Sequence, residues 1–338
     1  MVTLDKMDRC KTADVGPATH VSWIRHACAA LALTAAVCLA MPTPAHAQAW
    51  LPYKGEGALS FAYTFYKGGD HLFPVSVDGR ITRGYPSDGK RWFLGDSYGN
   101  ILNLSFDYGL ASRVAVSGSV AYAMTRYDGR AWFNFDLDDG DWHGTFQDVG
   151  LEVRAMALQR PLVITPLVGI GAPLDNYPTS GHAAVGRGIN EFRVGAYVGW
   201  QMSFLPSAYL HGSYIYGIAE EVDNVRLKRG VLALEAGYFL PQRLSVSANA
   251  SYQDTYGGLE WASADPDADA HSGGGEAPIG VNKVSATRFA LFGLGAGFSV
   301  GELGLYASWS TTVWGENVED TNFLTVGTSW SFSTPFAD

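Results

Sequence analysis

The feature that most constrains this chain is a two-residue alternation between apolar residues and small or polar residues. The segment 146–158 reads FQDVGLEVRAMAL, in which positions 149, 151, 153, 155 and 157 are apolar and most residues between them are polar or small. A short break at 159–161 precedes a second run that ends at position 171. This period is typical of a β-strand with two unlike faces. It recurs along the chain, with connections that alternate between short and long.

Repeated strands of this kind predict an all-β protein, a transmembrane antiparallel β-barrel of about 12 strands with short periplasmic turns and longer extracellular loops. A closed barrel pairs every backbone N–H and C=O inside lipid because it leaves no open edge. An even strand number puts both termini in the periplasm, which assigns the chain to the bacterial outer membrane. We expect strands at 56–66, 97–108, 113–124, 146–158, 162–171, 190–202, 207–218, 225–240, 243–253, 284–299, 303–313 and 321–333. A soluble β-sandwich or a β-rich secreted lectin is the alternative.

Pro166 conflicts with this assignment because it lies in the middle of an expected strand. Proline has no N–H and removes a hydrogen bond from the ladder, so in sheets it is confined to edges, strand starts and bulges. We therefore expect a β-bulge at this position.

The first 47 residues have the features of a cleaved signal peptide. A basic leader precedes the apolar run Ala27–Met41, which is too short to span a membrane comfortably, and Ala45-His46-Ala47 forms an A-x-A cleavage site. The mature barrel then comprises residues 48–338. An uncleaved membrane anchor is the alternative. The three cysteines, Cys10, Cys28 and Cys38, all precede the cleavage site, so the mature barrel has no disulfide or cysteine-based zinc site.

Net charge and composition limit the classes of molecule that this protein is expected to contact. The formal net charge is −10, which argues against nucleic acid as a partner. Glycine (40 residues), tyrosine (17) and tryptophan (10) are abundant, as expected for a barrel with aromatic girdles. The expected partners are outer-membrane lipids, lipopolysaccharide and small-molecule solutes.

Charged residues fall on the enclosed face of some strands. The expected lumen-lining residues are Asp148, Glu152, Arg154, Glu191, Arg193 and Glu235. The strand at 162–171 offers only uncharged, mostly small groups, so long Glu and Arg side chains have room to meet across it. Two compatible interpretations follow: a salt-bridged lumen that holds the wall together, and a polar constriction that selects small solutes.

Other polar clusters give weaker predictions. The aspartates within 136–141 lack the spacing of a calcium loop. Asp265, Asp267, Asp269 and His271 alternate, and weak Ca²⁺ binding by these carboxylates is the alternative to a solvated loop. We interpret both segments as solvated acidic loops and expect no metal and no cofactor. His211 and Ser213 share one face of an expected strand, as in outer-membrane phospholipases, but that family places the pair toward lipid and follows Ser with Asn-Gly. No orienting Asn can be named, and we expect the protein not to be an enzyme.

Three segments carry a family resemblance: PYKGEG at 52–57, DYGL at 107–110 and GTFQDVGL at 144–151. With them the chain resembles the outer-membrane barrels of the MetA-pathway phenol-degradation group. The resemblance implies a barrel that passes small hydrophobic or aromatic compounds, and it supplies no catalytic residues. The predicted function is an outer-membrane channel or transporter for small solutes. The alternatives are a surface-binding barrel with adhesin-like loops and an outer-membrane lipid hydrolase.

Overall fold

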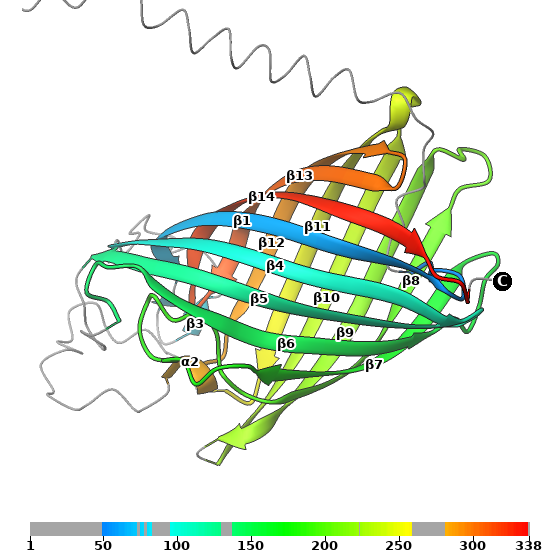
Figure 1. Ribbon diagram of the computed structural model, residues 1–338. Coiled ribbons are helices and arrows are strands. Elements are labelled where there is room, and N and C mark those ends of the chain that lie inside the picture. The colour runs from blue at the N-terminus through cyan, green and yellow to red at the C-terminus, as the bar shows by residue number, and fades with distance from the viewer. Residues whose placement is uncertain are drawn as a thin grey trace, which may run out of the picture. The chain divides into compact units, whose positions relative to one another are not determined.

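A computed structural model describes residues 49–72, 75–77, 80–82, 95–129, 137–222, 224–258 and 281–336, and the expected signal peptide lies outside these residues. Twelve strands form a closed antiparallel barrel, which confirms the predicted fold (Figure 1). They are β1 (Glu56–Leu72), β4 (Gly95–Ala111), β5 (Val114–Gly129), β6 (His143–Ala155), β7 (Val163–Pro173), β8 (Glu191–Gln201), β9 (Ala208–Val222), β10 (Val225–Phe239), β11 (Leu244–Tyr256), β12 (Arg288–Val300), β13 (Leu303–Glu316) and β14 (Val318–Ser333).

The first and last strands close the barrel. Each strand pairs with its neighbour in the chain, and β1 pairs with β14 from Glu56 opposite Ser333 to Leu72 opposite Val318. In Figure 1 the blue β1 and the red β14 lie side by side. Two short strands, β2 (Val75–Val77) and β3 (Arg80–Thr82), form a separate hairpin. Closure removes the open edges that would expose unpaired backbone groups to lipid.

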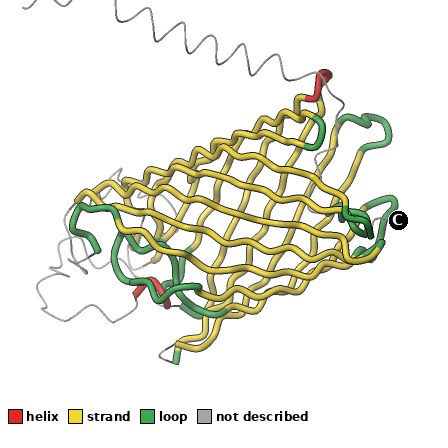
Figure 2. Tube along the Cα trace, in the orientation of Figure 1, coloured by secondary structure: helices red, strands yellow, loops and turns green. Residues whose placement is uncertain are grey.

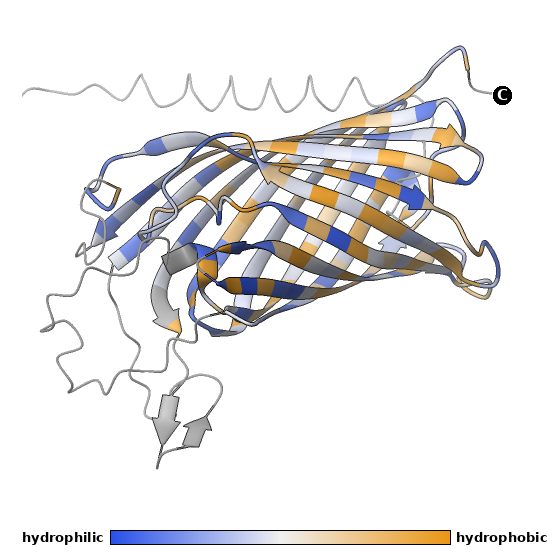
Figure 3. Ribbon diagram, turned by 90° about the horizontal axis from the view of Figure 1, so that it is seen from below, coloured by the Kyte–Doolittle hydropathy of each residue, from blue (hydrophilic) through white to orange (hydrophobic). Residues whose placement is uncertain are grey.

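The outer surface of the barrel is apolar. Large hydrophobic side chains are exposed at alternate positions along most strands, and Figure 3 shows hydrophobic residues alternating with paler ones. Examples with at least 40% exposure are Leu59, Phe61, Leu104, Leu151, Val168, Phe192, Leu234, Leu294 and Val326. So many exposed apolar side chains suit a protein that is solvated by lipid rather than by water. No helix in the described part of the chain is long and apolar enough to cross a membrane.

The two ends of the barrel differ in their connections. Both described ends of the chain lie with the short turns, among them the 3-10 turn η1 (Pro241–Arg243), and the longer loops lie at the opposite end (Figure 2). The strands extend beyond the expected bounds at the loop end, since β1 continues to Leu72 and β5 to Gly129. Two loop-end connections are also short, with Asn224 (φ 63°) and Asn317 (φ 55°) in the left-handed region that asparagine tolerates.

The expected strand at 284–299 begins later than predicted. Residues Val281–Val284 form the short helix α2, and β12 begins at Arg288. Three successive residues, Val284, Ser285 and Ala286, are buried. A strand that faces lipid on one side cannot bury consecutive residues, because its side chains alternate between two faces.

Pro166 lies beside a bulge, as predicted. Arg154 pairs with Leu167, and the next bridge joins Leu158 to Ile164. Three residues of the chain after β6 therefore oppose two residues of β7. The amide of Ala157 donates to the carbonyl of Ile164 (2.9 Å). Because the pairing is irregular here, no regular ladder hydrogen bond requires the N–H that proline lacks.

Candidate functional site

The loop between β7 and β8, residues 174–190, folds against the inner wall of the barrel and is called the inner loop here. Thr125 and Tyr127 belong to the inward-facing face of β5, and each is only 1% exposed. The Thr125 hydroxyl donates to the carbonyl of Ala183 (2.6 Å), and the Tyr127 ring stacks on His182 with 4.2 Å between centroids. The inner loop therefore occupies part of the lumen near the loop end.

A buried carboxylate fixes the inner loop to the loop between β5 and β6. Asp138 Oδ1 accepts a hydrogen bond from the amide of Ala183 (2.9 Å), and Oδ2 accepts one from the amide of His182 (3.0 Å). His182 Nδ1 also lies 3.0 Å from Oδ2, and the Asp138 side chain has no exposed surface. Burial alone would raise the pKa of Asp138, but the hydrogen bonds from His182 and Ala183 outweigh burial and hold the pKa below its ordinary value. This carboxylate is therefore charged at neutral pH.

A tyrosine ties the beginning of the inner loop to its end. The Tyr177 hydroxyl donates to Asp148 Oδ1 (2.5 Å) and accepts from the amide of Gly188 (2.9 Å). Burial and the bond to Asp148 raise the pKa of Tyr177, so the hydroxyl keeps its proton. Asp148, an expected lumen-lining residue, thus helps to set the shape of the inner loop.

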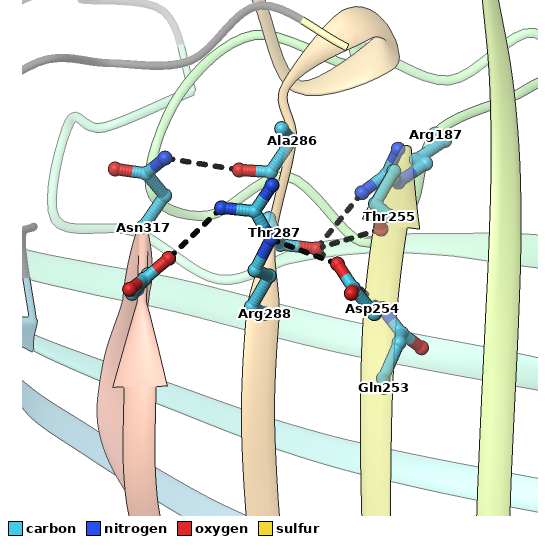
Figure 4. A network of polar contacts seen from close by, with 9 residues as sticks. Arg187, Gln253, Asp254, Thr255, Ala286, Thr287, Arg288 and Asn317 are labelled. Carbon is cyan, nitrogen blue, oxygen red and sulfur yellow. Dashed lines mark hydrogen bonds and ion pairs between the residues drawn. The ribbon is translucent and has the colours of Figure 1, made fainter. Parts of the chain in front are cut away.

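Further contacts join the inner loop to the opposite wall. Arg187 Nη2 donates to Thr287 Oγ1 (3.1 Å), as Figure 4 shows. Burial and the nearby Arg229 lower the pKa of Arg187 to about 10, so the guanidinium is still charged at neutral pH. Beside it, Arg288 bridges Asp254 (2.8 Å) and Glu316 (3.1 Å), which links β11, β12 and β13 at the loop end. The inner loop is held by hydrogen bonds on both sides of the lumen.

The main ion-pair cluster of the lumen centres on Glu191. Its Oε2 accepts from Arg193 Nε (2.7 Å) and from Arg229 Nη2 (2.5 Å), and the carboxylate side chain is 10% exposed. A Cβ atom at Gly217, on the strand between β8 and β10, would lie 2.3 Å from Glu191 Oε1. Glycine at position 217 therefore leaves the space through which Glu191 reaches Arg229.

The other expected lumen residues have different partners from those predicted. Arg154 pairs with Asp107 on β4, and Glu152 accepts a hydrogen bond from the Tyr197 hydroxyl (3.2 Å). Tyr197 thus makes two contacts across β7, the hydrogen bond to Glu152 and a cation–π contact with Arg154 (5.9 Å to the ring centroid), whereas the ion pairs of Arg154 and Glu191 do not cross β7. Glu235 accepts a hydrogen bond from Tyr209.

Small residues on β7 do leave room for long side chains. A Cβ atom at Gly169 would lie 2.9 Å from Glu152 Cγ, and one at Gly171 would lie 2.5 Å from Arg193 Nη2. The sequence analysis missed Arg229 and Tyr197 as partners. Arg229 has the same strand parity as Glu235, so the alternation contained the signal, but parity does not tell which residues meet.

The N-terminal segment also enters the lumen. Residues 49–52 are called the N-terminal strap here. The carbonyl of Ala49 accepts a hydrogen bond from the buried Thr165 hydroxyl on β7 (2.7 Å). Ala49 packs with Val163, Leu167 and Tyr197 on the inner faces of β7 and β8, and Trp50 packs against the same cluster. Nothing in the sequence analysis predicted this contact, because the strap is not part of a periodic segment.

The strap lies inside the lumen near the short-turn end. A Cβ atom at Gly109 of β4 would lie 2.7 Å from the carbonyl oxygen of Pro52, so that end of the strap lies at β4. Three strand spacings separate β4 from β7, about 14 Å or more along the wall. The backbone from residue 49 to residue 52 spans at most about 11 Å. The strap is shorter than the wall between its two contacts, so it lies inside the wall and occupies part of the lumen beside β4–β7.

His211 lies in the same region. Its ring stacks on Tyr197 with 5.7 Å between centroids, and it pairs in register with Glu235. Within the described residues, its buried Nε2 atom has no hydrogen-bond partner. In a His–Ser catalytic pair a ring nitrogen lies within hydrogen-bond reach of the hydroxyl, and among the described residues His211 Nε2 has no such partner.

No group of three or more potential metal ligands is present in the ranges that the structure describes. In the first acidic loop, Asp138 is engaged by the inner loop and Asp139 by His143 (2.8 Å). The second acidic segment, at 265–269, lies outside the described residues.

Comparisons with known proteins bear on the fold. No protein-family description and no curated protein matches the sequence. A COG4313 outer membrane channel from Pseudomonas putida F1 has a similar structure, with a TM-score of 0.58 and 12% identity over 86% of this chain and 100% of that chain. The translocator domain of autotransporter NalP from Neisseria meningitidis has a TM-score of 0.45 and 11% identity over 92% of this chain and 98% of that chain. At these identities the likeness concerns the fold alone.

The closed barrel and its apolar outer surface are the architecture of bacterial outer-membrane proteins. The protein is therefore a 12-stranded outer-membrane β-barrel.

Proposed function

We propose that this barrel is an outer-membrane channel for small solutes, with the path running through its lumen. The observation that carries the proposal is the charged cluster inside the barrel. Glu191, Arg193 and Arg229 lie on the enclosed faces of β8 and β10 and form two ion pairs there (2.7 and 2.5 Å). Charged groups on an enclosed face select among permeating solutes by size and charge.

The aromatic side chains inside the barrel near the short-turn end suggest the kind of solute. Trp50, Tyr197 and His211 lie near one another between β7, β8 and β9, with Ile215 packed against the same cluster. Aromatic faces and small apolar surfaces favour contact with small aromatic or hydrophobic compounds. This is in keeping with the sequence resemblance to barrels of the phenol-degradation group. We infer that small aromatic or hydrophobic solutes are the cargo.

Ion selectivity tests whether the Glu191 cluster lines the path. Glu191→Gln removes a negative charge and should shift the reversal potential in a salt gradient toward anion preference. Arg193→Gln should shift it toward cation preference. The measurement is single-channel recording of each purified variant in a planar bilayer.

Asp128→Asn is the matched control, because Asp128 pairs with Arg126 on the outward-facing side of the barrel rim and its side chain is 64% exposed. It should leave the reversal potential unchanged. Equal reversal potentials in all four proteins would mean that ions do not pass beside the Glu191 cluster.

A further inference from the structure

The N-terminal strap is weakly attached to the wall that it touches. Among the described residues, the hydrogen bond from Thr165 to the Ala49 carbonyl is the one that joins residues 49 and 50 to β7 and β8. The remaining attachment is apolar contact with Val163, Leu167 and Tyr197. Such a hydrogen bond contributes about 0.5–1.5 kcal/mol net, and the apolar contacts of Ala49 and Trp50 involve no charged group, so release costs less than unfolding the barrel.

Release of the strap would not disturb the sheet. The ladder between β1 and β14 begins at Glu56, and Gly55 is held separately by the carbonyl of Gly109 (2.9 Å). The strap precedes both contacts. Thr165 has no exposed surface while the strap is bound, so its hydroxyl would gain access to the lumen when the strap leaves. The barrel can therefore remain closed as a sheet while the strap moves.

We propose that the N-terminal strap is a gate at the short-turn end of the lumen, which opens when Ala49 and Trp50 leave the β7–β8 wall. In the bound state the strap occupies the lumen beside β4–β7 and narrows it. In the released state the strap hangs from Pro52 and the lumen is open across its width. The inference rests on the proposed channel function.

Gly199 gives a direct way to lock the gate. A Cβ atom at this position would lie 2.8 Å from the Cβ of Ala49 and 2.7 Å from the Trp50 ring. A disulfide needs Cβ atoms about 3.5–4.5 Å apart, a separation that a small shift of the strap supplies. The double variant Ala49→Cys with Gly199→Cys should therefore form a disulfide that holds the strap on β8. The full chain for this test has serine in place of its natural cysteines, Cys10, Cys28 and Cys38.

The test is single-channel recording of the double variant before and after reduction, with mass spectrometry to show the disulfide. The oxidised protein should stay in a low-conductance state, and reduction should restore transitions to a higher state. Ala49→Cys alone is the control and should not respond to reduction. Equal records before and after reduction, or failure of the disulfide to form in a heat-modifiable barrel, would overturn the gate.

A second pair of variants removes one hydrogen bond without changing side-chain shape. Thr165→Val deletes the bond to the Ala49 carbonyl and should raise the ratio of open to closed time roughly 2- to 12-fold. Thr325→Val deletes a bond of similar length, to Thr64 (2.8 Å), on the wall formed by β1 and β14. It should leave the ratio unchanged. The same ratio in both variants would overturn the gate, whereas absence of current from every protein, wild type included, would overturn the channel itself.

Discussion

The inner loop and the N-terminal strap both lie inside the barrel, but they are held in different ways. The inner loop is fixed by a buried carboxylate, Asp138, and by hydrogen bonds to β5, β6 and β12. The strap is attached through one side-chain hydroxyl and a small apolar cluster on β7 and β8. The attachment of the inner loop therefore involves a buried charge and several parts of the wall. The attachment of the strap involves only neutral groups and the neighbouring strands β7 and β8.

This difference indicates which element moves. Releasing the inner loop would leave the Asp138 charge and its donors unpaired in a buried place, which is costly. Releasing the strap exposes one hydroxyl and an apolar contact with Val163, Leu167 and Tyr197, but no charged group. We therefore expect the inner loop to set a permanent constriction near the loop end, and the strap to open and close the lumen near the short-turn end.

Removing the Asp138 carboxylate should have the largest effect on stability. Asp138→Ala leaves the amides of His182 and Ala183 without their acceptor, and it should lower the free energy of unfolding by roughly 3–5 kcal/mol. Equilibrium unfolding in urea with lipid vesicles measures the change. Asp139→Ala is the matched control, because the neighbouring carboxylate is exposed and should contribute little. If both variants lowered the free energy of unfolding equally, the buried carboxylate of Asp138 would hold the inner loop no more firmly than the exposed carboxylate of Asp139.

Acid should release the inner loop and spare the strap. The pKa of Asp138 is lowered below its ordinary value of 3.8, so its stabilisation is complete above that value and is lost as the pH falls through the lowered folded-state pKa. The strap, residues 49–52, contains no titratable side chain. Amide hydrogen exchange, corrected for the intrinsic rate at each pH, should show loss of protection at His182 and Ala183 in acid. Asp138→Asn should abolish this pH dependence, and an acid-dependent loss at Trp50 as well would contradict the contrast.

The fold was predictable because alternation records the two environments of a barrel wall. Each strand places apolar residues such as Leu151 toward lipid and residues such as Glu152 toward the lumen. The order of apolar and polar residues in the sequence therefore tells which face of a strand points outward. The strand ends at the loop side were less predictable. There polar residues stand on both faces of the strand and remove the alternation, as in the extension of β5 to Gly129.

The site was predictable only in part, because parity gives the face of a side chain and not its partner. The expected residues Glu191 and Arg193 do pair, but Arg154 reaches back to Asp107, which lies two strands away from it around the wall. The inner loop and the strap could not be placed at all. Their contacts depend on how non-periodic segments fold into the lumen, and Asp138 is indistinguishable in sequence from the aspartates beside it.

Deletion of the strap tests the central claim most directly. A chain in which residue 48 is joined to Tyr53 keeps every strand, so its stability should change little. Single-channel recording should show a steady current larger than that of the wild type, whose current should fluctuate between a low and a high state. Identical records from the two proteins would contradict the account of a lumen gated by its N-terminus, and no current from either would contradict the channel.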